Sequence, residues 1–292
     1  MRHVSFGLRL AAVCLATCAS APVVQAAPAM LWEVSGLANP ESALPDVKAG
    51  IIYVSTVNGA PDAKDGNGAI ATVSLDGKTV NAKWSTGFNA PKGLALAGGK
   101  LYAADIDELV EIDTKDGKIS KRYPAKDAKF LNDVAADAAG NVYVSDMATN
   151  TIWKLSGGTF AVWLSDAKLE NPNGLLVEGG DLRVAQWGVM TDGFATKVPG
   201  HLISVTLDGK AISAVGDGTP FGNLDGLEPL GGGAYLITDW MAGKVMKYDA
   251  GGKIEILLEL GQGAADIGYD AASKTMFVPQ MVKGTLAAYK VE

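Results

Sequence analysis

The stretch FLNDVAADAAGNVYVSD at residues 130–146 is one copy of a repeat that recurs along the whole chain. It has a small oxygen-bearing side chain, Asn132, then a short apolar strand, a glycine-containing turn and a second apolar strand. Three other stretches share this layout, namely PESALPDVKAGIIYVST (40–56), NPNGLLVEGGDLRVAQW (171–187) and NLDGLEPLGGGAYLITD (223–239). The equivalent polar residues, which we call the heads, are Glu41, Asn132, Asn173 and Asp225.

In two further copies the side chain at the head position has no oxygen atom. They are APKGLALAGGKLYAAD (90–105), headed by Lys92, and AADIGYDAASKTMFVPQ (264–280), headed by Ala265. Each copy continues into two more apolar strands joined by a tight Asp-Gly or Gly-Gly turn, such as LDGK at 75–78. Six copies at intervals of about 40–50 residues, built from short strands, predict an all-β fold, a six-bladed β-propeller.

Composition agrees with a fold made of many hairpins. The chain has 292 residues and 36 glycines, which cluster in the predicted turns. No long segment shows a 3.6-residue apolar period, so helix is expected to be minor. The formal net charge of −7 argues against nucleic acid as a partner.

The first 26 residues have the pattern of a signal peptide. Arg2 and Arg9 accompany an apolar run, and VQA precedes Ala27, as signal peptidase requires. The run is too short for a membrane span. Cleavage would remove both cysteines and leave residues 27–292 as a single propeller domain in the periplasm or secreted.

The last repeat lacks a fourth strand, since the chain ends at TLAAYKVE. The stretch MLWEVSG at 30–36 can supply it. A strand from one terminus that completes the blade of the other closes the ring and removes an open sheet edge. We therefore expect residues 30–36 to pair with residues 285–291.

Two repeats carry long insertions after their second strands, at residues 58–68 and 188–200. In a propeller the first strand begins and the second strand ends at the same face, so these loops are expected to cover a ligand pocket near the heads. The second-strand ends also place Trp187 and Trp240 there, either to stack on a substrate ring or acyl chain or to pack against loops. Asp146 or Asp239 is a candidate for activating water.

The heads form a candidate metal site. Radial blades would bring Glu41, Asn132, Asn173 and Asp225 together on the ring axis. Two carboxylates and two amide oxygens suit a hard divalent cation, above all Ca²⁺, with Zn²⁺ or Mn²⁺ as alternatives. The competing explanation is that Asn or Asp before Gly is ordinary turn chemistry.

The motifs PES (40–42), LND (131–133), PNG (172–174) and LDG (224–226) resemble those of the regucalcin/gluconolactonase family, six-bladed propellers that hydrolyse sugar lactones with a divalent metal. The resemblance implies a small-molecule substrate, a lactone or sugar-derived ester, with Glu41, Asn173 and Asp225 as metal ligands and Asn132 at the metal or on the substrate. Asp225 or Glu41 would be the catalytic carboxylate. Lys92, absent from that pattern, would anchor substrate or mark a metal site in decay.

Other interpretations remain open. NHL-type propellers, which bind without turnover, have repeats similar to LNDVAADAAGNVYVSD. A structural Ca²⁺ on the axis, with ligands recognised by the loops, is a third. The family's aromatic stretch after the Glu motif and its substrate-holding Arg have no counterpart here, and neither histidine, His3 or His201, is expected at the axis.

Overall fold

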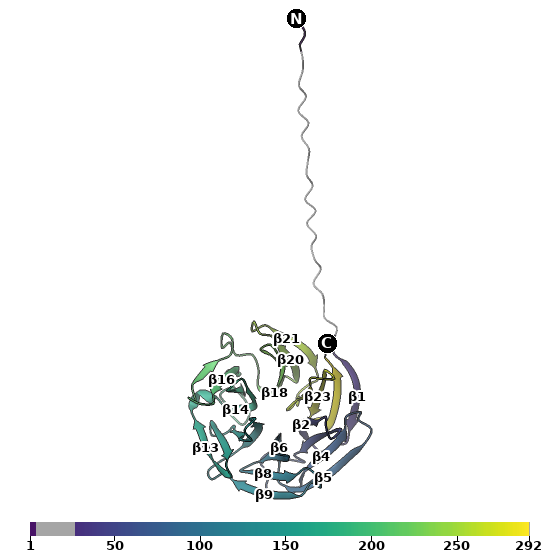
Figure 1. Ribbon diagram of the computed structural model, residues 1–292, viewed down its shortest axis with the longest axis vertical. Helices are drawn as coiled ribbons and strands as arrows, with labels where there is room; N and C mark the ends of the chain where they lie inside the picture. Colours follow the sequence, from purple (N-terminus) through teal and green to yellow (C-terminus); the bar gives the residue numbers. More distant parts are fainter. Residues whose placement is uncertain (4–26, 292) are drawn as a thin grey trace.

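The computed structural model describes residues 1–3 and 27–291, and it is a six-bladed β-propeller. The predicted signal peptide at residues 1–26 falls almost entirely on residues outside this description. Figure 1 looks down the ring axis, with β2, β6, β14 and β18 around the centre and β1, β5, β9 and β13 at the rim. The predicted fold class is confirmed.

Each blade is a four-stranded antiparallel sheet whose strands follow one another from the axis outward. The first three blades are β2 (Pro40–Asp46), β3 (Ile51–Thr56), β4 (Gly68–Ser74) and β5 (Val80–Phe88); β6 (Pro91–Ala97), β7 (Lys100–Asp105), β8 (Glu108–Asp113) and β9 (Ile119–Pro124); β10 (Leu131–Ala136), β11 (Val142–Asp146), β12 (Thr151–Ser156) and β13 (Thr159–Ser165).

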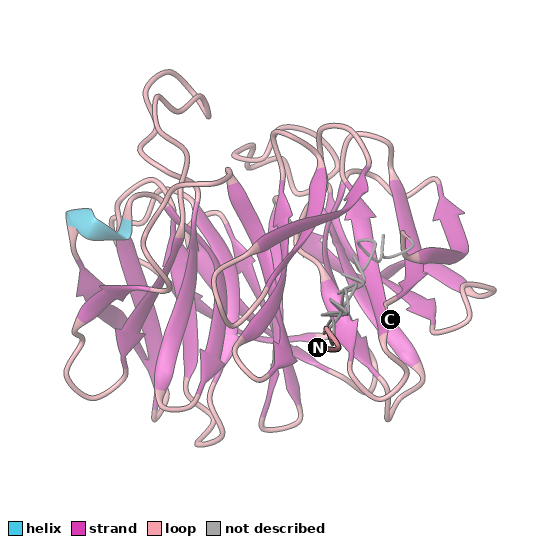
Figure 2. Cartoon of the chain, turned by 90° about the horizontal axis from the view of Figure 1, so that it is seen from above, coloured by secondary structure: helices cyan, strands magenta, loops and turns pink. Residues whose placement is uncertain are grey.

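Blades four and five are β14 (Pro172–Glu178), β15 (Asp181–Gln186), β16 (Leu202–Thr206) and β17 (Ile212–Ala214); β18 (Leu224–Gly231), β19 (Ala234–Asp239), β20 (Lys244–Tyr248) and β21 (Ile254–Glu259). The sixth is β22 (Gly268–Asp270), β23 (Thr275–Gln280), β24 (Thr285–Lys290) and β1 (Ala29–Ser35). A 3-10 turn, η1 (Ala167–Leu169), links blades three and four. Figure 2 shows the ring from the side, with η1 in cyan at the same face as the longest loops. Within the described residues no helix is long and apolar enough to cross a membrane.

The ring closes through its N-terminal strand, as the sequence predicts. β1 pairs antiparallel with β24, from Ala29 opposite Lys290 to Ser35 opposite Thr285. Trp32 on this strand reaches the neighbouring first blade, where its Nε1 donates to the carbonyl of Leu75 at 3.0 Å. Its ring covers Gly77, where an added Cβ would lie 2.6 Å from a ring carbon. Closure therefore depends on one side chain as well as on strand pairing.

Six apolar clusters fill the six spaces between blades. In each, alternate residues of one sheet meet those of the next, as Val54 and Phe277 do between blades one and six. The other five clusters lie between the remaining pairs of neighbouring blades. The core is thus a ring around the axis, and the axis itself is left to the heads.

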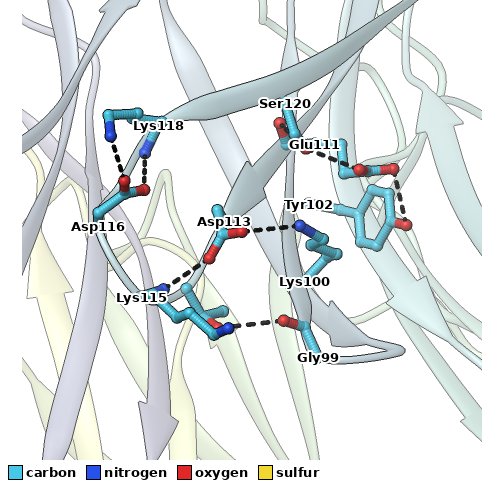
Figure 3. Close-up of polar contacts among 10 residues, drawn as sticks. Gly99, Lys100, Tyr102, Glu111, Asp113, Lys115, Asp116, Lys118 and Ser120 are labelled. Atoms are coloured by element: carbon cyan, nitrogen blue, oxygen red, sulfur yellow. Dashed lines mark hydrogen bonds and ion pairs between the residues drawn. The ribbon is translucent and has the colours of Figure 1, made fainter.

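Blade two carries charged pairs on the strands outside β6 and on the turn between β8 and β9. Figure 3 shows the rim of blade two, where Lys100 pairs with Asp113 at 2.9 Å and Lys118 with Asp116 at 2.5 Å. Glu111 accepts hydrogen bonds from Tyr102 and Ser120. Ion pairs that water can reach add little stability, and these residues lie on β7, β8, β9 and the turn between β8 and β9, away from the axis.

Candidate functional site

Each of the five polar heads, Lys92 included, is the second residue of an innermost strand, and each stands in a β-bulge. In blade one, Pro40 lies opposite Thr56 but Ala43 lies opposite Val54, so the inner strand holds one extra residue around Glu41. The same register shift surrounds Lys92, Asn132, Asn173 and Asp225. Bulges re-aim side chains next to functional sites. Five equivalent bulges therefore give the heads a common setting.

In blades one, three and five the backbone of the bulge is held by a hydroxyl group on the second strand. The N–H of Ser42 donates to Ser55 Oγ at 2.9 Å, and the N–H of Asp133 donates to Ser145 Oγ at 2.8 Å. Blade five repeats this bond with Thr238. A buried N–H without a partner would be costly, and here the neighbouring strand satisfies it. The head side chain is thereby free for other contacts.

The glycine after a head allows adjacent inner strands to approach closely. An added Cβ at Gly174 would lie 1.9 Å from the carbonyl oxygen of Asp225, and one at Gly226 would lie 2.3 Å from the N of Ile267. Neither glycine has a positive φ, and both lie inside strands. Turn chemistry is therefore the wrong explanation of Asn-Gly and Asp-Gly here, because these glycines are required by packing at the axis.

The five polar heads line one cavity of about 260 Å³ together with Trp187 and Trp240. All five head side chains are buried, with between 1% and 5% of their surface exposed. The other lining residues are apolar: Pro61, Phe130, Met147, Phe194 and Met281. Convergence of the heads and of both tryptophans on one cavity is thus as the sequence predicts, while Ala265 leaves the sixth position without a functional side chain.

Three acceptor oxygens in this cavity have no hydrogen-bond donor. They are Glu41 Oε2, Asn132 Oδ1 and Asn173 Oδ1. The amide of Asn132 instead lies 3.7 Å from Met147 Sδ, and the side chain of Asn173 lies beside Asp225, whose pKa it lowers. Buried acceptors without donors are uncommon and call for an explanation. A hard cation would supply one, because it binds carboxylate and amide oxygens together.

A cation at this place would need the amides. Across residues 1–3 and 27–291 no three His, Cys, Asp or Glu side chains are grouped so as to hold a metal ion. The heads supply two carboxylates, Glu41 and Asp225, and complete the set with two asparagine oxygens. This donor set fits Ca²⁺ better than Zn²⁺, since Zn²⁺ prefers nitrogen and sulfur ligands.

The carboxyl groups near the axis outnumber the ammonium groups that could balance their negative charge. Burial raises the pKa of Glu41 well above its ordinary value, and the carboxyl groups of Asp225 and Asp266 raise it further. Burial also raises the pKa of Asp225, with Asp266 adding to the effect and Asn173 opposing it. Lys92 is the cation of this cavity. Protons or a bound cation must balance the rest.

Lys92 lines the cavity with the other polar heads, and two contacts hold its ammonium group. Its ammonium donates to the carbonyl of Ala90 at 3.0 Å and stands 4.4 Å from the centre of the Phe130 ring. Burial lowers its pKa to about 8, while Glu41 acts in the opposite direction. An ammonium in this position can approach an anionic group bound in the cavity.

Both insertions contribute to the cavity, as the sequence predicts. Pro61 comes from the loop after β3 and Phe194 from the loop after β15. Phe194 packs edge-on against Phe130 at 5.6 Å and against Trp187 at 6.0 Å, and Trp187 lies 6.2 Å from Trp240. Trp187 Nε1 donates to the carbonyl of Phe194 at 2.9 Å. The two tryptophans therefore both pack against loops and line the cavity.

The second-strand ends are otherwise structural, which corrects the expectation that they line the mouth. Asp146 accepts from the backbone N–H groups of Lys129 and Phe130, both at 3.0 Å. Asp239 accepts from the N–H of Ala242 at 2.9 Å. Neither lines the cavity. Their carboxylates hold loops, so their proposed role in activating water is wrong.

Two carboxyl groups, the buried Asp133 and the partly exposed Asp266, escaped notice in the sequence. Each follows a head directly and joins neighbouring blades. Asp133 accepts from the N–H of Leu175 at 2.6 Å, and Asp266 accepts from Ser42 Oγ at 2.5 Å. Both line a second cavity, of about 250 Å³, farther along the inner strands. The two aspartates are visible in the motifs LND (131–133) and AAD (264–266). An aspartate in such a motif is ordinarily interpreted as a turn residue, so neither was predicted to be functional.

These acids predict how stability depends on pH when no divalent cation is bound. Burial raises the pKa of Asp266 from 3.8 to about 7, and Glu41 and Asp225 are raised as well. Between about pH 4 and 7 the folded state keeps protons that the unfolded chain releases, so the free energy of unfolding falls as pH rises. Melting curves in chelator at pH 4.5–7 should show this fall.

Two controls define that prediction. Asp266→Asn should weaken the pH dependence, because it removes one of the raised groups, and added Ca²⁺ should weaken it by favouring the ionised carboxylates. The exposed carboxyls whose pKa values are lowered, such as Asp113, titrate below this range. A melting temperature in chelator that rises from pH 4.5 to 7 would contradict the prediction.

Solved structures share the fold at low sequence identity. A gluconolactonase from Xanthomonas campestris is 14% identical with a TM-score of 0.65, covering 93% of this chain and 97% of that chain. Virginiamycin B lyase from Staphylococcus aureus is 13% identical with a TM-score of 0.61, covering 89% and 99%. A chain in a nidogen–laminin complex is 16% identical with a TM-score of 0.58, covering 77% and 91%.

Gluconolactonases are thus among the structural neighbours, which agrees with the resemblance of the motifs. No protein-family model and no curated protein sequence matches the chain. The fold and the cavity together define a six-bladed propeller with a polar, carboxylate-containing site on its axis, open at the face that carries the long loops.

Proposed function

We propose that this protein is a metal-dependent hydrolase that opens the ring of a lactone or cleaves a related sugar-derived ester. The observation that carries the proposal is the set of three buried acceptor oxygens without donors, next to the carboxylate of Asp225 in an accessible cavity. A site for binding alone has no need of uncompensated carboxylates. The fold shared with a gluconolactonase is consistent with this chemistry but does not decide it.

Glu41, Asn132, Asn173 and Asp225 would hold the cation, with Ca²⁺ as the preferred ion. A divalent cation bound there would polarise the carbonyl oxygen of a lactone and stabilise the oxyanion. Asn173 lies beside Asp225 and favours its ionised form. The bulges fix all four side chains on rigid strands, which holds the ligand set at one point.

Hydrolysis adds the oxygen of a water molecule to the carbonyl carbon and breaks the bond from that carbon to the ring oxygen. Asp225 or Glu41 accepts the proton of the water, and the proton then passes to the ring oxygen, which leaves as an alcohol. The product is a hydroxy acid. Lys92 is placed to pair with its new carboxylate, because the ammonium lines the same cavity.

A panel of γ- and δ-lactones, assayed with Ca²⁺, Zn²⁺, Mn²⁺ or chelator, tests the proposal. We expect hydrolysis with Ca²⁺, a fall of at least about 100-fold in chelator, and recovery when Ca²⁺ is restored. Asp208→Asn is a suitable control, since Asp208 is exposed in the turn between β16 and β17. Rates no higher than the uncatalysed blank with every metal would overturn it.

The second candidate is a binding propeller without turnover. The buried Lys92 favours it, because an ammonium close to a cation site weakens cation binding. Propellers of this shape also occur in complexes such as nidogen with laminin. A lyase is less well supported. The S. aureus lyase is described as inactive when a histidine is replaced by alanine, whereas the residues lining this cavity include no histidine.

We also propose that the protein is exported from the cytoplasm. The sequence of residues 1–26 supports cleavage before Ala27 and a periplasmic or secreted protein. N-terminal sequencing of the protein recovered from the periplasm or medium tests this, and an intact Met1 in that fraction would contradict it.

A further inference from the structure

The cavity is divided by depth into a polar floor and an apolar wall. The floor consists of the heads, which all stand on inner strands. The wall consists of seven residues from loops and strand ends: Pro61, Phe130, Met147, Trp187, Phe194, Trp240 and Met281. A molecule that reaches the floor with its reactive group must therefore place the remainder of its body against carbon and sulfur.

The wall offers few hydrogen-bonding groups. Five of its seven residues have no N–H or O–H in the side chain, and Trp187 Nε1 is already bound to the carbonyl of Phe194. The carbonyls of Met147 and Met281 accept from Asn171 and Asn39. Trp240 Nε1 is the remaining side-chain donor. Hydroxyl groups of a sugar would lose water here without finding partners, which disfavours their binding.

We infer that the substrate of this site carries an apolar body, an alkyl or aryl group on the lactone or ester, and is not a polyhydroxylated sugar lactone. The inference rests on the proposed hydrolase function for the reactive group of the substrate. The apolar body of the substrate is inferred from the wall residues alone. Trp187, Phe194 and Trp240 form a continuous aromatic surface at the mouth, and a cavity of about 260 Å³ suits a small ring with a short chain.

A homologous series tests the inference. The substrates are δ-valerolactones with linear alkyl groups of zero to six carbons, compared with glucono-δ-lactone, all in Ca²⁺. Burial of each methylene should raise kcat/KM about fourfold until the cavity is full, so four methylenes should give more than about 100-fold. Glucono-δ-lactone should be hydrolysed no faster than unsubstituted valerolactone.

Binding is measured separately from turnover with the matching lactams, which keep the ring and the chain but resist hydrolysis. Titration calorimetry should show affinity rising with chain length. Phe194→Ser should flatten that rise, whereas Val189→Ser in the same loop should not, because Val189 is 52% exposed and does not line the cavity. Met281→Gln, in the turn between β23 and β24, provides a second wall variant if Phe194→Ser disturbs its own loop.

The outcomes separate the two proposals. Lactams that bind more tightly with longer chains, without turnover of any lactone, support the apolar body and overturn the hydrolase. Hydrolysis or binding that is independent of chain length, or that is strongest for the sugar compound, overturns the apolar body and leaves the hydrolase in place.

Discussion

Asp225→Asn is expected to abolish lactone hydrolysis and, at the same time, the stabilisation of the protein by Ca²⁺. Asp225 supplies one of the two carboxylates of the candidate site, and asparagine keeps its shape but not its charge. A cation bound only by the folded ring stabilises it by about 2.7 kcal/mol at a hundredfold excess over Kd. That corresponds to a rise of roughly 5–10 °C in Tm, which the variant should lose.

In chelator the same variant should melt at or above the temperature of the parent protein. The raised pKa of Asp225 favours its protonated form without a cation, so a neutral amide costs little there. Asp208→Asn should keep the full response to Ca²⁺. If the parent protein melts at the same temperature with chelator and with Ca²⁺, the site holds no cation, and the binding propeller with Lys92 at its axis becomes the better account.

Removal of β1 is expected to be the most destabilising change outside the axis. Without residues 29–35 the backbone of β24 becomes an open edge, and the space that Trp32 fills over Gly77 is lost. Loss of a packed tryptophan alone costs about 3–5 kcal/mol when it is fully buried. We expect Tm to fall by at least about 10 °C, measured by circular dichroism, with aggregation detectable by size-exclusion chromatography.

Point variants isolate the role of the side chain from that of the strand. Trp32→Ala should account for a large share of the loss, and Leu31→Ala on the same strand should have little effect, because Leu31 is 51% exposed at the bulge. A protein lacking β1 that melts at the parental temperature would show that the ring does not depend on this closure.

The repeat made most of the fold predictable. The order of strands within each blade, the closing strand and the convergence of Glu41, Asn132, Asn173 and Asp225 all follow from equivalence of position. The two loops at the cavity were predictable for a related reason, since only they lengthen the repeat. The same reasoning led to one wrong prediction. Asp146 and Asp239 end equivalent strands, but their carboxylates accept hydrogen bonds from backbone N–H groups of nearby loops and do not line the cavity.

The wall of the cavity could not be predicted in the same way. Met147 and Met281 directly follow β11 and β23, at the position that Trp187 and Trp240 hold after β15 and β19, but an apolar methionine there gives no signal of a ligand site. Whether Phe194 reaches Trp187 depends on the path of a long loop, and that path is fixed by contacts such as Trp187 Nε1 with the Phe194 carbonyl. The carboxyls of Asp133 and Asp266 were hidden for another reason, since their partners lie in the next blade.

The bulge at each inner strand has a consequence for how this protein can change. In blades one, three and five its N–H is satisfied by a hydroxyl of the neighbouring strand, at Ser55, Ser145 and Thr238, and not by the head. In these three blades the bulge therefore does not need the head side chain as its hydrogen-bond partner. Glu, Lys, Asn and Asp all occupy the same backbone setting in this one chain. The same backbone position thus accepts side chains of different charge. We therefore expect that a head can be substituted in one blade at a time, which changes the site, while the propeller still folds.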